Sequence, residues 1–255
     1  SFSDKELKDV VDELYLDDTV DIVEEMPASI VKRILKQANS ETRQMINEML
    51  KYPADSAGSI MTPEFVDLYR DMTINEAIQH IRETGVDKET INVCYVTNVS
   101  RQLIGEVSIR TLILADLSAT VDSVMTKNTV SVNTQEDKED VAHVFSKYGC
   151  IVVPVVDSEE RLVGIVTVDD AMDVMRDETT EDIDKMAAIT PSDKPYLKLS
   201  TFDIYKSRIP WLLILMISAA FTGAIITHFE DALSAYLVLA ASIPMIMDTG
   251  GNCGS

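Results

Sequence analysis

The hydrophobic pattern of this chain changes character near residue 207. Before that point, apolar residues recur at helical or strand spacing among many charged residues, as in domains that fold in water. Residues 209–229 then contain no charged side chain over 21 positions, which is enough to cross a hydrocarbon core of about 30 Å at about 1.5 Å per residue. A second apolar run covers residues 232–247. The pattern predicts a water-soluble region, one complete membrane helix and part of a second.

Residues 3–51 show the three- and four-residue spacing of amphipathic helices. Ser3 followed by Glu6 predicts a capping box at the start of the first helix. Pro27 predicts a break, after which apolar residues return at helical spacing to about residue 50. We therefore expect the end of a small helical array, separated from the next domain by Tyr52 and Pro53.

Approximately the next 130 residues contain an internal repeat. Residues 59–62 read SIMT and residues 123–126 read SVMT, while LIGEVS at 103–108 returns as LVGIVT at 162–167. A fixed period of this kind indicates two copies of one supersecondary unit.

Each copy has a helix followed by a run rich in β-branched residues. The helices are expected to begin with caps near Thr73 and Thr134, and the β-branched runs cover residues 91–97 and 151–156. Each copy is therefore predicted to be a β-α-β-β-α unit of about 60 residues.

The soluble region is strongly acidic. The whole chain has a formal net charge of −21, and only four of its 43 acidic residues lie beyond residue 200. Such a surface repels nucleic acid and anionic lipid headgroups, and it attracts cations. We therefore expect no nucleic-acid partner.

The cysteines and histidines do not indicate a zinc site or a catalytic thiol. The three cysteines, Cys94, Cys150 and Cys253, lie far apart, which disfavours a disulfide framework and indicates a reducing compartment. The three histidines have no ligand spacing with them. No nucleophile–base set or glycine-rich phosphate loop is present, so the sequence does not predict an enzyme.

Charges beside the first apolar span indicate its orientation. Four basic residues precede the span, and Glu230 and Asp231 follow it; the basic residues are Lys194, Lys198, Lys206 and Arg208. Positive charge is retained on the cytoplasmic side of membrane helices. We therefore expect residues 1–206 in the cytoplasm. The two apolar runs together indicate a multi-pass membrane protein.

Acidic residues form three groups in the soluble region. The first is Asp17, Asp18 and Asp21 on one helix, where a spacing of four places Asp17 and Asp21 on the same face. The second comprises Glu136, Asp137, Glu139 and Asp140, at a helix start where the helix dipole already accounts for acids. The third is a helical stripe made by Asp170, Asp173, Asp177, Glu181 and Asp184, with Glu178 and Asp182 beside it.

Two interpretations of the third group remain open: a solvated charged face, or a site for a hard cation. Exposed helices usually interleave basic residues with acids, but this one offers only Arg176 and Lys185. Carboxylate oxygens without thiol or imidazole partners suit Mg²⁺ or Ca²⁺. No EF-hand loop is present, so a site would have to be assembled between elements.

These repeats resemble a tandem pair of cystathionine β-synthase (CBS) regulatory domains over residues 56–178. The resemblance rests mainly on PVVD at 154–157, GIVT at 164–167 and Asp170. It implies two units packed by their sheets into one disc that senses a ligand. A nucleotide is the competing ligand, with Thr167 near phosphate and Asp170 near ribose; the equivalent positions of the first copy, Ser108 and Thr111, lack the carboxylate.

The order of segments along the whole chain resembles the MgtE family of magnesium channels and transporters. The last part of this resemblance is TGGNCG at residues 249–254, where Asn252 would be costly facing lipid. The resemblance implies an α+β and membrane fold with the following domains: the end of a helical N domain (1–52), CBS domain 1 (53–117), CBS domain 2 (118–182), a connecting or plug helix (183–206), and a first transmembrane helix with a truncated second (207–255).

The family resemblance also implies a function and a set of sites. It implies Mg²⁺ uptake by a homodimer that contacts itself through the CBS and transmembrane domains, with lipid around it and ATP as a further ligand. Asn252 would belong to the pore. The acidic sensor positions that it implies are Asp17, Asp21, Asp137, Glu139, Asp170, Glu178, Glu181 and Asp182, and the acidic stripe adds Asp173.

The expected mechanism is electrostatic gating. When intracellular Mg²⁺ is low, the acidic faces repel one another; when it is high, bridging ions draw them together and the pore closes. The alternative is a CBS nucleotide sensor that regulates another membrane carrier, in which the acids are only solvated.

Overall fold

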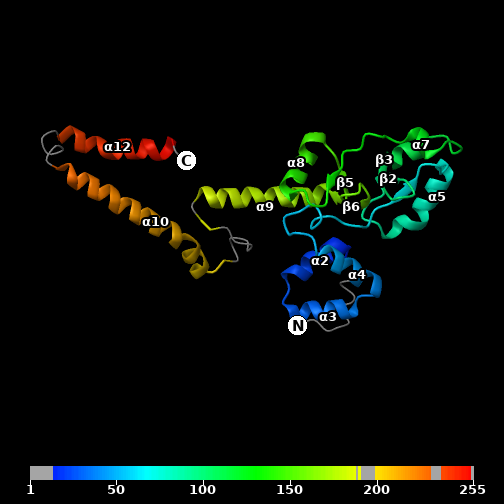
Figure 1. Cartoon of the computed structure of the whole chain (residues 1–255), viewed down its shortest axis with the longest axis horizontal. Helices are drawn as coiled ribbons and strands as arrows, with labels where there is room; N and C mark the ends of the chain where they lie inside the picture. Colours follow the sequence, from blue (N-terminus) through cyan, green and yellow to red (C-terminus); the bar gives the residue numbers. More distant parts are fainter. Residues whose placement is uncertain (1–13, 188, 191–198, 231–236, 254–255) are drawn as a thin grey trace. The chain divides into compact units, whose positions relative to one another are not determined.

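The computed structural model describes residues 14–187, 189–190, 199–230 and 237–253. The chain divides into two compact units, residues 1–175 and 176–255. Figure 1 traces the elements along the chain, from the helices in blue to the apolar helices in orange and red.

Three short amphipathic helices open the described part of the first unit. They are α2 (Leu16–Glu25), α3 (Ala28–Gln37) and α4 (Ser40–Met49). Leu16 and Val20 of α2 pack with Ile46 and Met49 of α4 in one buried cluster. The helices predicted within residues 14–51 are confirmed, whereas Ser3 and Glu6 lie outside the described residues.

The first repeat is a three-stranded sheet with helices. Strand β1 pairs parallel to β2, and β2 pairs antiparallel to β3. The elements are β1 (Asp67–Tyr69), α5 (Ile74–Thr84), η1 (Gly85–Asp87), β2 (Val93–Thr97), β3 (Leu103–Ser108) and α6 (Ile109–Leu114). A capping box between Thr73 and Glu76 starts α5, as the sequence predicted.

The second repeat has the same topology. Strand β4 pairs parallel to β5, and β5 pairs antiparallel to β6. The elements are α7 (Val121–Val124), β4 (Val132–Asn133), α8 (Lys138–Tyr148), β5 (Val152–Val156), β6 (Leu162–Thr167) and α9 (Val168–Met186). The predicted repeat of two β-α-β-β-α units is therefore confirmed.

The expected start of the second repeat's helix was wrong by about one turn. Asp137, and not Thr134, is the N-cap of α8, and its side chain accepts a hydrogen bond from the Glu139 N–H at 2.9 Å. Thr134 instead donates its N–H to the Val156 carbonyl at 3.0 Å. The Thr134 carbonyl accepts the Gly58 N–H at 3.0 Å, so it does not accept the first hydrogen bond of a helix.

Two equivalent pairings of backbone, each between a segment with the repeated SIMT or SVMT sequence and a β-strand, hold the repeats together; we call each pairing a crossing. Thr62 exchanges two backbone hydrogen bonds with Ile165 of β6, at 2.8 and 2.9 Å. Thr126 does the same with Glu106 of β3, at 2.8 and 3.0 Å. Between the sheets lies a shared apolar cluster of Phe65, Tyr95, Val152, Leu162 and Ile165.

Each crossing passes over a glycine. A Cβ atom added at Gly105 would lie 2.8 Å from the Thr126 carbonyl oxygen, and one at Gly164 would lie 3.0 Å from the Thr62 carbonyl oxygen. The close approach of backbone to strand at each crossing therefore requires a residue without a side chain.

The second unit contains two apolar helices, α10 (Thr201–His228) and α12 (Leu237–Cys253). Among the described residues, α10 is the one helix that is both long and apolar enough to cross a membrane, with a mean hydropathy of 2.2 in its most apolar window. It begins at Ser200, whose side chain forms a capping box with Asp203. The first residues of the predicted second span, 232–236, lie outside the described residues.

The expectation of one helix over residues 183–206 differs from the structure. Helix α9 ends at Met186, and the described residues 187, 189, 190, 199 and 200 are not helical. Thr190 instead donates its N–H and its hydroxyl to the Ser207 carbonyl of α10, both at 3.1 Å. This contact lies one turn before Pro210, which has no N–H for the helical ladder.

We predict that Gly105→Ala destabilises the protein by about 1–3 kcal/mol, because the added methyl group pushes the Thr126 segment off β3. Chemical unfolding of the variant and the parent chain measures the difference. Val99→Ala is the control, since Val99 is 99% exposed and its truncation creates no cavity. Equal stability of all three chains would show that the crossing adjusts without loss.

Candidate functional site

Carboxylates from four parts of the first unit influence one another electrostatically. They are Asp17 of α2, Glu64 after the Thr62 crossing, Glu89 before β2, and Asp169 with Asp170 in the first turn of α9. Nearly fifty residues separate Asp17 from Glu64, and eighty more separate Glu89 from Asp169. The fold therefore gathers acids that are distant in sequence.

Backbone and hydroxyl contacts position three of these acids. Glu64 accepts a hydrogen bond from the N–H of Leu16 at 3.3 Å, which links the start of α2 to the first CBS repeat. Glu64 also receives the Glu89 N–H on its carbonyl at 2.9 Å. Asp170 accepts a hydrogen bond from the Thr167 hydroxyl at 2.5 Å. Leu16 is buried in the helical cluster, so the α2 end of this arrangement is anchored by packing.

Burial and mutual repulsion make ionisation of this group unfavourable. Burial, followed by the neighbouring charge of Asp170, raises the pKa of Asp17 to about 7. Burial, with the charges of Asp17 and Asp170, raises the pKa of Glu89 to about 7 as well. One oxygen of Glu89 is buried without a hydrogen-bond partner among the described residues.

The other two partly buried acids are shifted in the same direction. Burial raises the pKa of Asp170, although the Thr167 hydroxyl opposes the shift. Burial also raises the pKa of Glu64, opposed by the Leu16 N–H and by the charge of Lys88. At neutral pH this group of acids is therefore stabilised by positive charge, whether it comes from protons or from a bound cation.

The chemistry of the donors suits a hard divalent cation. The groups that could ligate an ion are carboxylates and the Thr167 hydroxyl, and Lys88 is a nearby cation that acts on Glu64. Mg²⁺ prefers oxygen ligands while keeping several of its own waters. Within the part of the chain that the structure describes, no three such side chains are close enough together to hold a metal ion directly. The residues present thus fit a hydrated ion between elements better than a closed cage.

The structure brings together two of the predicted sensor residues, Asp17 and Asp170. Asp137 and Glu139 serve α8 locally: Asp137 is its N-cap, and Glu139 lies 3.8 Å from the imidazole of His143. Asp21 lies on α2, but its side chain is outside the described residues.

The remaining predicted acids lie along α9. Asp173 is exposed and belongs to the first unit, while Glu178, Glu181 and Asp182 belong to the second. Glu181 forms an ion pair with Lys185 at 2.6 Å, one helical turn away. Asn252 lies in α12, and its side chain is also outside the described residues.

Sequence reasoning missed Glu64 and Glu89. Each is an isolated acid in a loop, so neither belongs to a helical stripe or a run that a pattern search would detect. Their one shared signal is position: Glu64 follows the repeated SIMT segment, and Glu89 precedes the first β-branched run. Glu64 and Glu89 come near α2 and α9 only because the two repeats pack against each other in the folded protein.

The proposed nucleotide positions differ between the repeats as the sequence suggested. In the second repeat Thr167 bonds the Asp170 carboxylate, whereas in the first the Ser108 and Thr111 hydroxyls bond each other at 2.8 Å. A carboxylate that could receive ribose hydroxyls is therefore present only in the second of these two turns.

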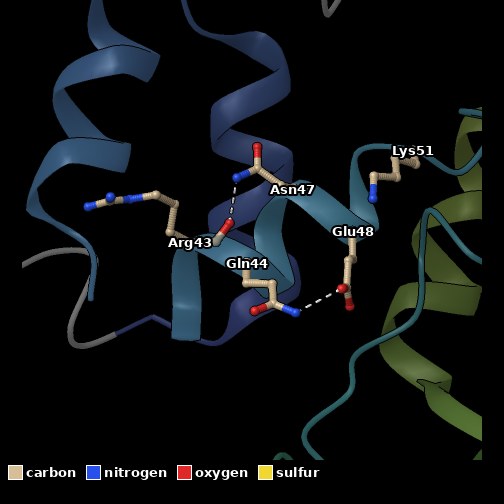
Figure 2. A pocket seen from close by; sticks show the side chains of 5 residues that line it. All are labelled: Arg43, Gln44, Asn47, Glu48 and Lys51. Carbon is tan, nitrogen blue, oxygen red and sulfur yellow. Dashed lines mark hydrogen bonds between the residues drawn. The ribbon is translucent and has the colours of Figure 1, made fainter. Parts of the chain in front are cut away.

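A polar hollow of about 320 Å³ lies elsewhere, along one side of α4 (Figure 2). Gln44 donates to Glu48 at 3.1 Å within it, and Asn47 donates to the Arg43 carbonyl at 2.7 Å. Arg43 donates to the Leu35 and Ala38 carbonyls, at 2.6 and 3.0 Å. Its guanidinium therefore satisfies carbonyls at the end of α3. The residues that line the hollow are all polar or charged, unlike the predominantly hydrophobic lining of most ligand pockets.

We predict that, without divalent ions, the free energy of unfolding decreases as the pH is raised from about 4 to about 7. The ionisation of Asp17 and Glu89 causes this decrease. In the unfolded chain these acids release protons near pH 3.8 and 4.5; in the folded chain they do so near pH 7. Between those values the folded state holds more protons, so its stability decreases as pH rises.

Chemical unfolding at pH 5 and pH 8 measures this effect in the chain and in Asp17→Asn with Glu89→Gln. The variant should lose less stability than the parent between the two pH values. A parallel fall in both proteins would mean that other groups carry the pH dependence.

Comparisons with known proteins support the two-part organisation of the first unit. A family model described as the MgtE intracellular N domain matches residues 1–55. The model of the CBS domain matches twice, over residues 57–118 and 121–177. Neither description names a catalytic activity.

Curated relatives carry the name magnesium transporter MgtE. The protein from Thermus thermophilus is 38% identical over 240 residues, which cover 94% of this chain and 53% of the relative. The protein from Bacillus subtilis is 35% identical over 243 residues, covering 94% and 52%. The chain thus spans about half the length of the curated relatives that it matches.

Solved structures agree with the fold. The cytosolic domain of the Mg²⁺ channel MgtE, crystallised in complex with ATP, has a TM-score of 0.65 and 38% identity, covering 68% of this chain and 71% of that one. The soluble part of a magnesium transporter has a TM-score of 0.67 and 34% identity, covering 69% of each chain. The expected helical region and CBS pair are confirmed, and the chain belongs to the MgtE family.

Proposed function

We propose that this protein takes up Mg²⁺ across the cell membrane as a channel or transporter, and that its helical domain and CBS pair sense intracellular Mg²⁺. The observation that carries the sensing role is the group of repelling carboxylates shared by α2, the Glu64 and Glu89 loops, and the start of α9. The transport role is supported by the relatives' names and by α10, which is long enough to span a bilayer.

Sensing follows from a difference in ion affinity between two arrangements. Without Mg²⁺, charge repulsion weakens the contact of α2 with the CBS pair, which the Leu16–Glu64 hydrogen bond otherwise favours. A hydrated Mg²⁺ near Asp17 and Asp170 offsets that repulsion and stabilises the closed arrangement. Several weak sites of this kind together shift the protein toward the closed arrangement, because each ion binds that arrangement more tightly than the open one.

The remaining predicted acids extend the same mechanism. Asp21, Asp137, Glu139, Asp173, Glu178, Glu181 and Asp182 would supply further ion contacts as the assembly closes. Closure would move the connecting residues 183–206 against the pore, to which Asn252 would contribute. The domain boundaries at residues 52, 117, 182 and 206 are part of this proposal, as are a homodimer, a lipid environment and a cytoplasmic location for residues 1–206.

A nucleotide is the second candidate ligand of the CBS pair. The Thr167–Asp170 pair supports it, as does the ATP complex of a relative's cytosolic domain. Under this alternative the CBS pair senses nucleotide and regulates a carrier, and the acids are only solvated. The two candidates differ in whether Mg²⁺ alone changes the structure.

We predict that Asp17→Asn with Asp170→Asn weakens inhibition of uptake by intracellular Mg²⁺ in the full-length protein, so that a higher Mg²⁺ concentration is needed. Neutral side chains remove part of the repulsion that the ions relieve, so the two arrangements differ less in affinity for Mg²⁺. Flux into proteoliposomes, measured against internal Mg²⁺, reports the inhibition. Asp71→Asn with Glu83→Gln is the control, because it removes two exposed charges from the first CBS repeat, away from Asp17 and Asp170 in sequence.

Limited proteolysis of the same proteins separates the two candidates. Protection of the Tyr52–Pro53 segment by Mg²⁺, lost in the double variant and kept in the control, supports the cation sensor. Inhibition at the same Mg²⁺ concentration in the double variant and the parent, or protection that requires ATP and ignores Mg²⁺, would overturn it.

A further inference from the structure

Helix α2 has no side-chain cap from its own N-terminal residue. The helix begins at Leu16, and the side chain of the preceding residue, Tyr15, makes no capping hydrogen bond. The first N–H groups of a helix have no partner within the helix. Helix α4 shows the usual solution, because Asn39 accepts a hydrogen bond from the Thr42 N–H at 2.7 Å. The start of α2 therefore needs an acceptor from elsewhere in the chain.

The first CBS repeat supplies that acceptor. An oxygen of the Glu64 carboxylate accepts the Leu16 N–H at 3.3 Å, across 48 positions of sequence. Asp17, in the first turn of α2, accepts the Asp18 N–H instead, at 3.0 Å. The Glu64 carboxylate is stabilised by a charge-assisted hydrogen bond and by the partial positive charge at the start of the helix. Glu64 is thus a helix cap that comes from another domain.

The backbone around Glu64 is fixed. Its N–H donates to the Thr62 hydroxyl at 3.4 Å, and its carbonyl accepts the Glu89 N–H at 2.9 Å. Thr62 is itself paired with Ile165 of β6. The carboxylate therefore extends from an ordered part of the CBS pair, so that only the Glu64 side chain must lose freedom to make the bond.

The covalent linker from the helices is attached to the second repeat. The Asp55 carbonyl accepts the Lys138 N–H at 3.1 Å, and the Asp55 carboxylate forms an ion pair with the Lys138 ammonium group at 2.8 Å. Two residues later, the Ala57 N–H donates to the Glu136 carbonyl at 2.7 Å. Any movement of the helices relative to the repeats is thus confined to the few residues between Met49, where α4 ends, and Asp55.

The contact at Leu16 reaches the other helices through packing. Leu16 and Val20 of α2 form one buried cluster with Ile46 and Met49 of α4. Helices α2 and α4 are therefore held at two places, by the linker on the second repeat and by Glu64 on the first.

We propose that Glu64 is a positioning residue, whose carboxylate oxygen holds the start of α2 on the CBS pair as a releasable clasp. The linker is a permanent attachment, whereas the clasp is one hydrogen bond that can break and form again. Its part in regulation rests on the proposed Mg²⁺ sensor, because Asp17 follows Leu16 directly and moves with it. The closed clasp brings Asp17 toward Asp170, and the open clasp lets the helices move about the linker.

The clasp and the charge of Glu64 lead to opposite predictions. If Glu64 acted only as one of the repelling acids, neutralising it would strengthen the contact of α2 with the CBS pair. As a clasp, it must keep an oxygen within reach of the Leu16 N–H. Glu64→Gln keeps such an oxygen without the charge, whereas Glu64→Asp keeps the charge on a side chain that is one methylene group shorter.

The test is hydrogen–deuterium exchange of the full chain in detergent, with saturating Mg²⁺ and without divalent ions, at constant ionic strength. We expect Glu64→Ala and Glu64→Asp to speed exchange at the start of α2 by about three- to tenfold, because the Leu16 N–H loses its partner. Glu64→Gln should speed it by less than about twofold, since its amide oxygen still accepts the bond. Glu83→Ala is the matched control, because it removes an exposed acid from α5 of the same repeat and should change nothing.

Two results would overturn the clasp: equal exchange in Glu64→Ala and the parent, or exchange in Glu64→Gln as fast as in Glu64→Ala. Failure of the Mg²⁺ sensor has a different signature. In that case Mg²⁺ alters exchange in none of the proteins, while Glu64→Ala remains faster than the parent, which supports the clasp alone. Unchanged exchange in β1, β2 and β3 verifies that each variant is folded, and Glu64→Asp provides the second variant if Glu64→Ala is not.

Discussion

The pairing of Thr62 with Ile165 is the contact on which both the fold and the acidic group depend. It fixes the start of the first repeat to the last strand of the second. Glu64 and Asp170 therefore lie only a few residues from the two sides of one crossing. The equivalent pairing of Thr126 with Glu106 completes the disc. Both crossings need a glycine beneath them, and a buried apolar cluster fills the space between the sheets.

Once the disc is closed, α2 contacts it at a place where charge opposes packing. The Leu16 N–H reaches Glu64, yet Asp17 is then brought toward Asp170 and Glu89. Attraction through backbone and apolar contacts and repulsion between carboxylates act in opposite directions at one surface. Such a balance responds to small changes in bound positive charge, which is the physical requirement for a sensor.

The duplicated fold also shows how one topology supports different chemistry. The β2–β3 and β5–β6 pairs have the same register and the same crossing, and both are interrupted by an irregularity after the fourth pair. Yet one presents Tyr95 and Glu106 between the sheets, and the other presents Pro154 and Ile165. Likewise, the turn after β6 carries a carboxylate at Asp170, and the turn after β3 has Thr111.

Local sequence determined most of the elements of this protein. Helical spacing, the capping box at Thr73, the repeated segments and the uncharged run from residue 209 identify helices, repeats and a membrane span, because each depends on neighbours in the chain. The acidic character of α9 is visible for the same reason. The N-cap of α8 could not be placed this way, since Thr134 is held by Val156 of another strand.

The tertiary structure alone decided which acids meet. Asp17 and Asp170 were suspected from the family resemblance, but nothing local links Glu64 and Glu89 to them. Burial and electrostatic coupling depend on distances through space, and those distances are set by the crossing of strands that lie about 100 residues apart in sequence.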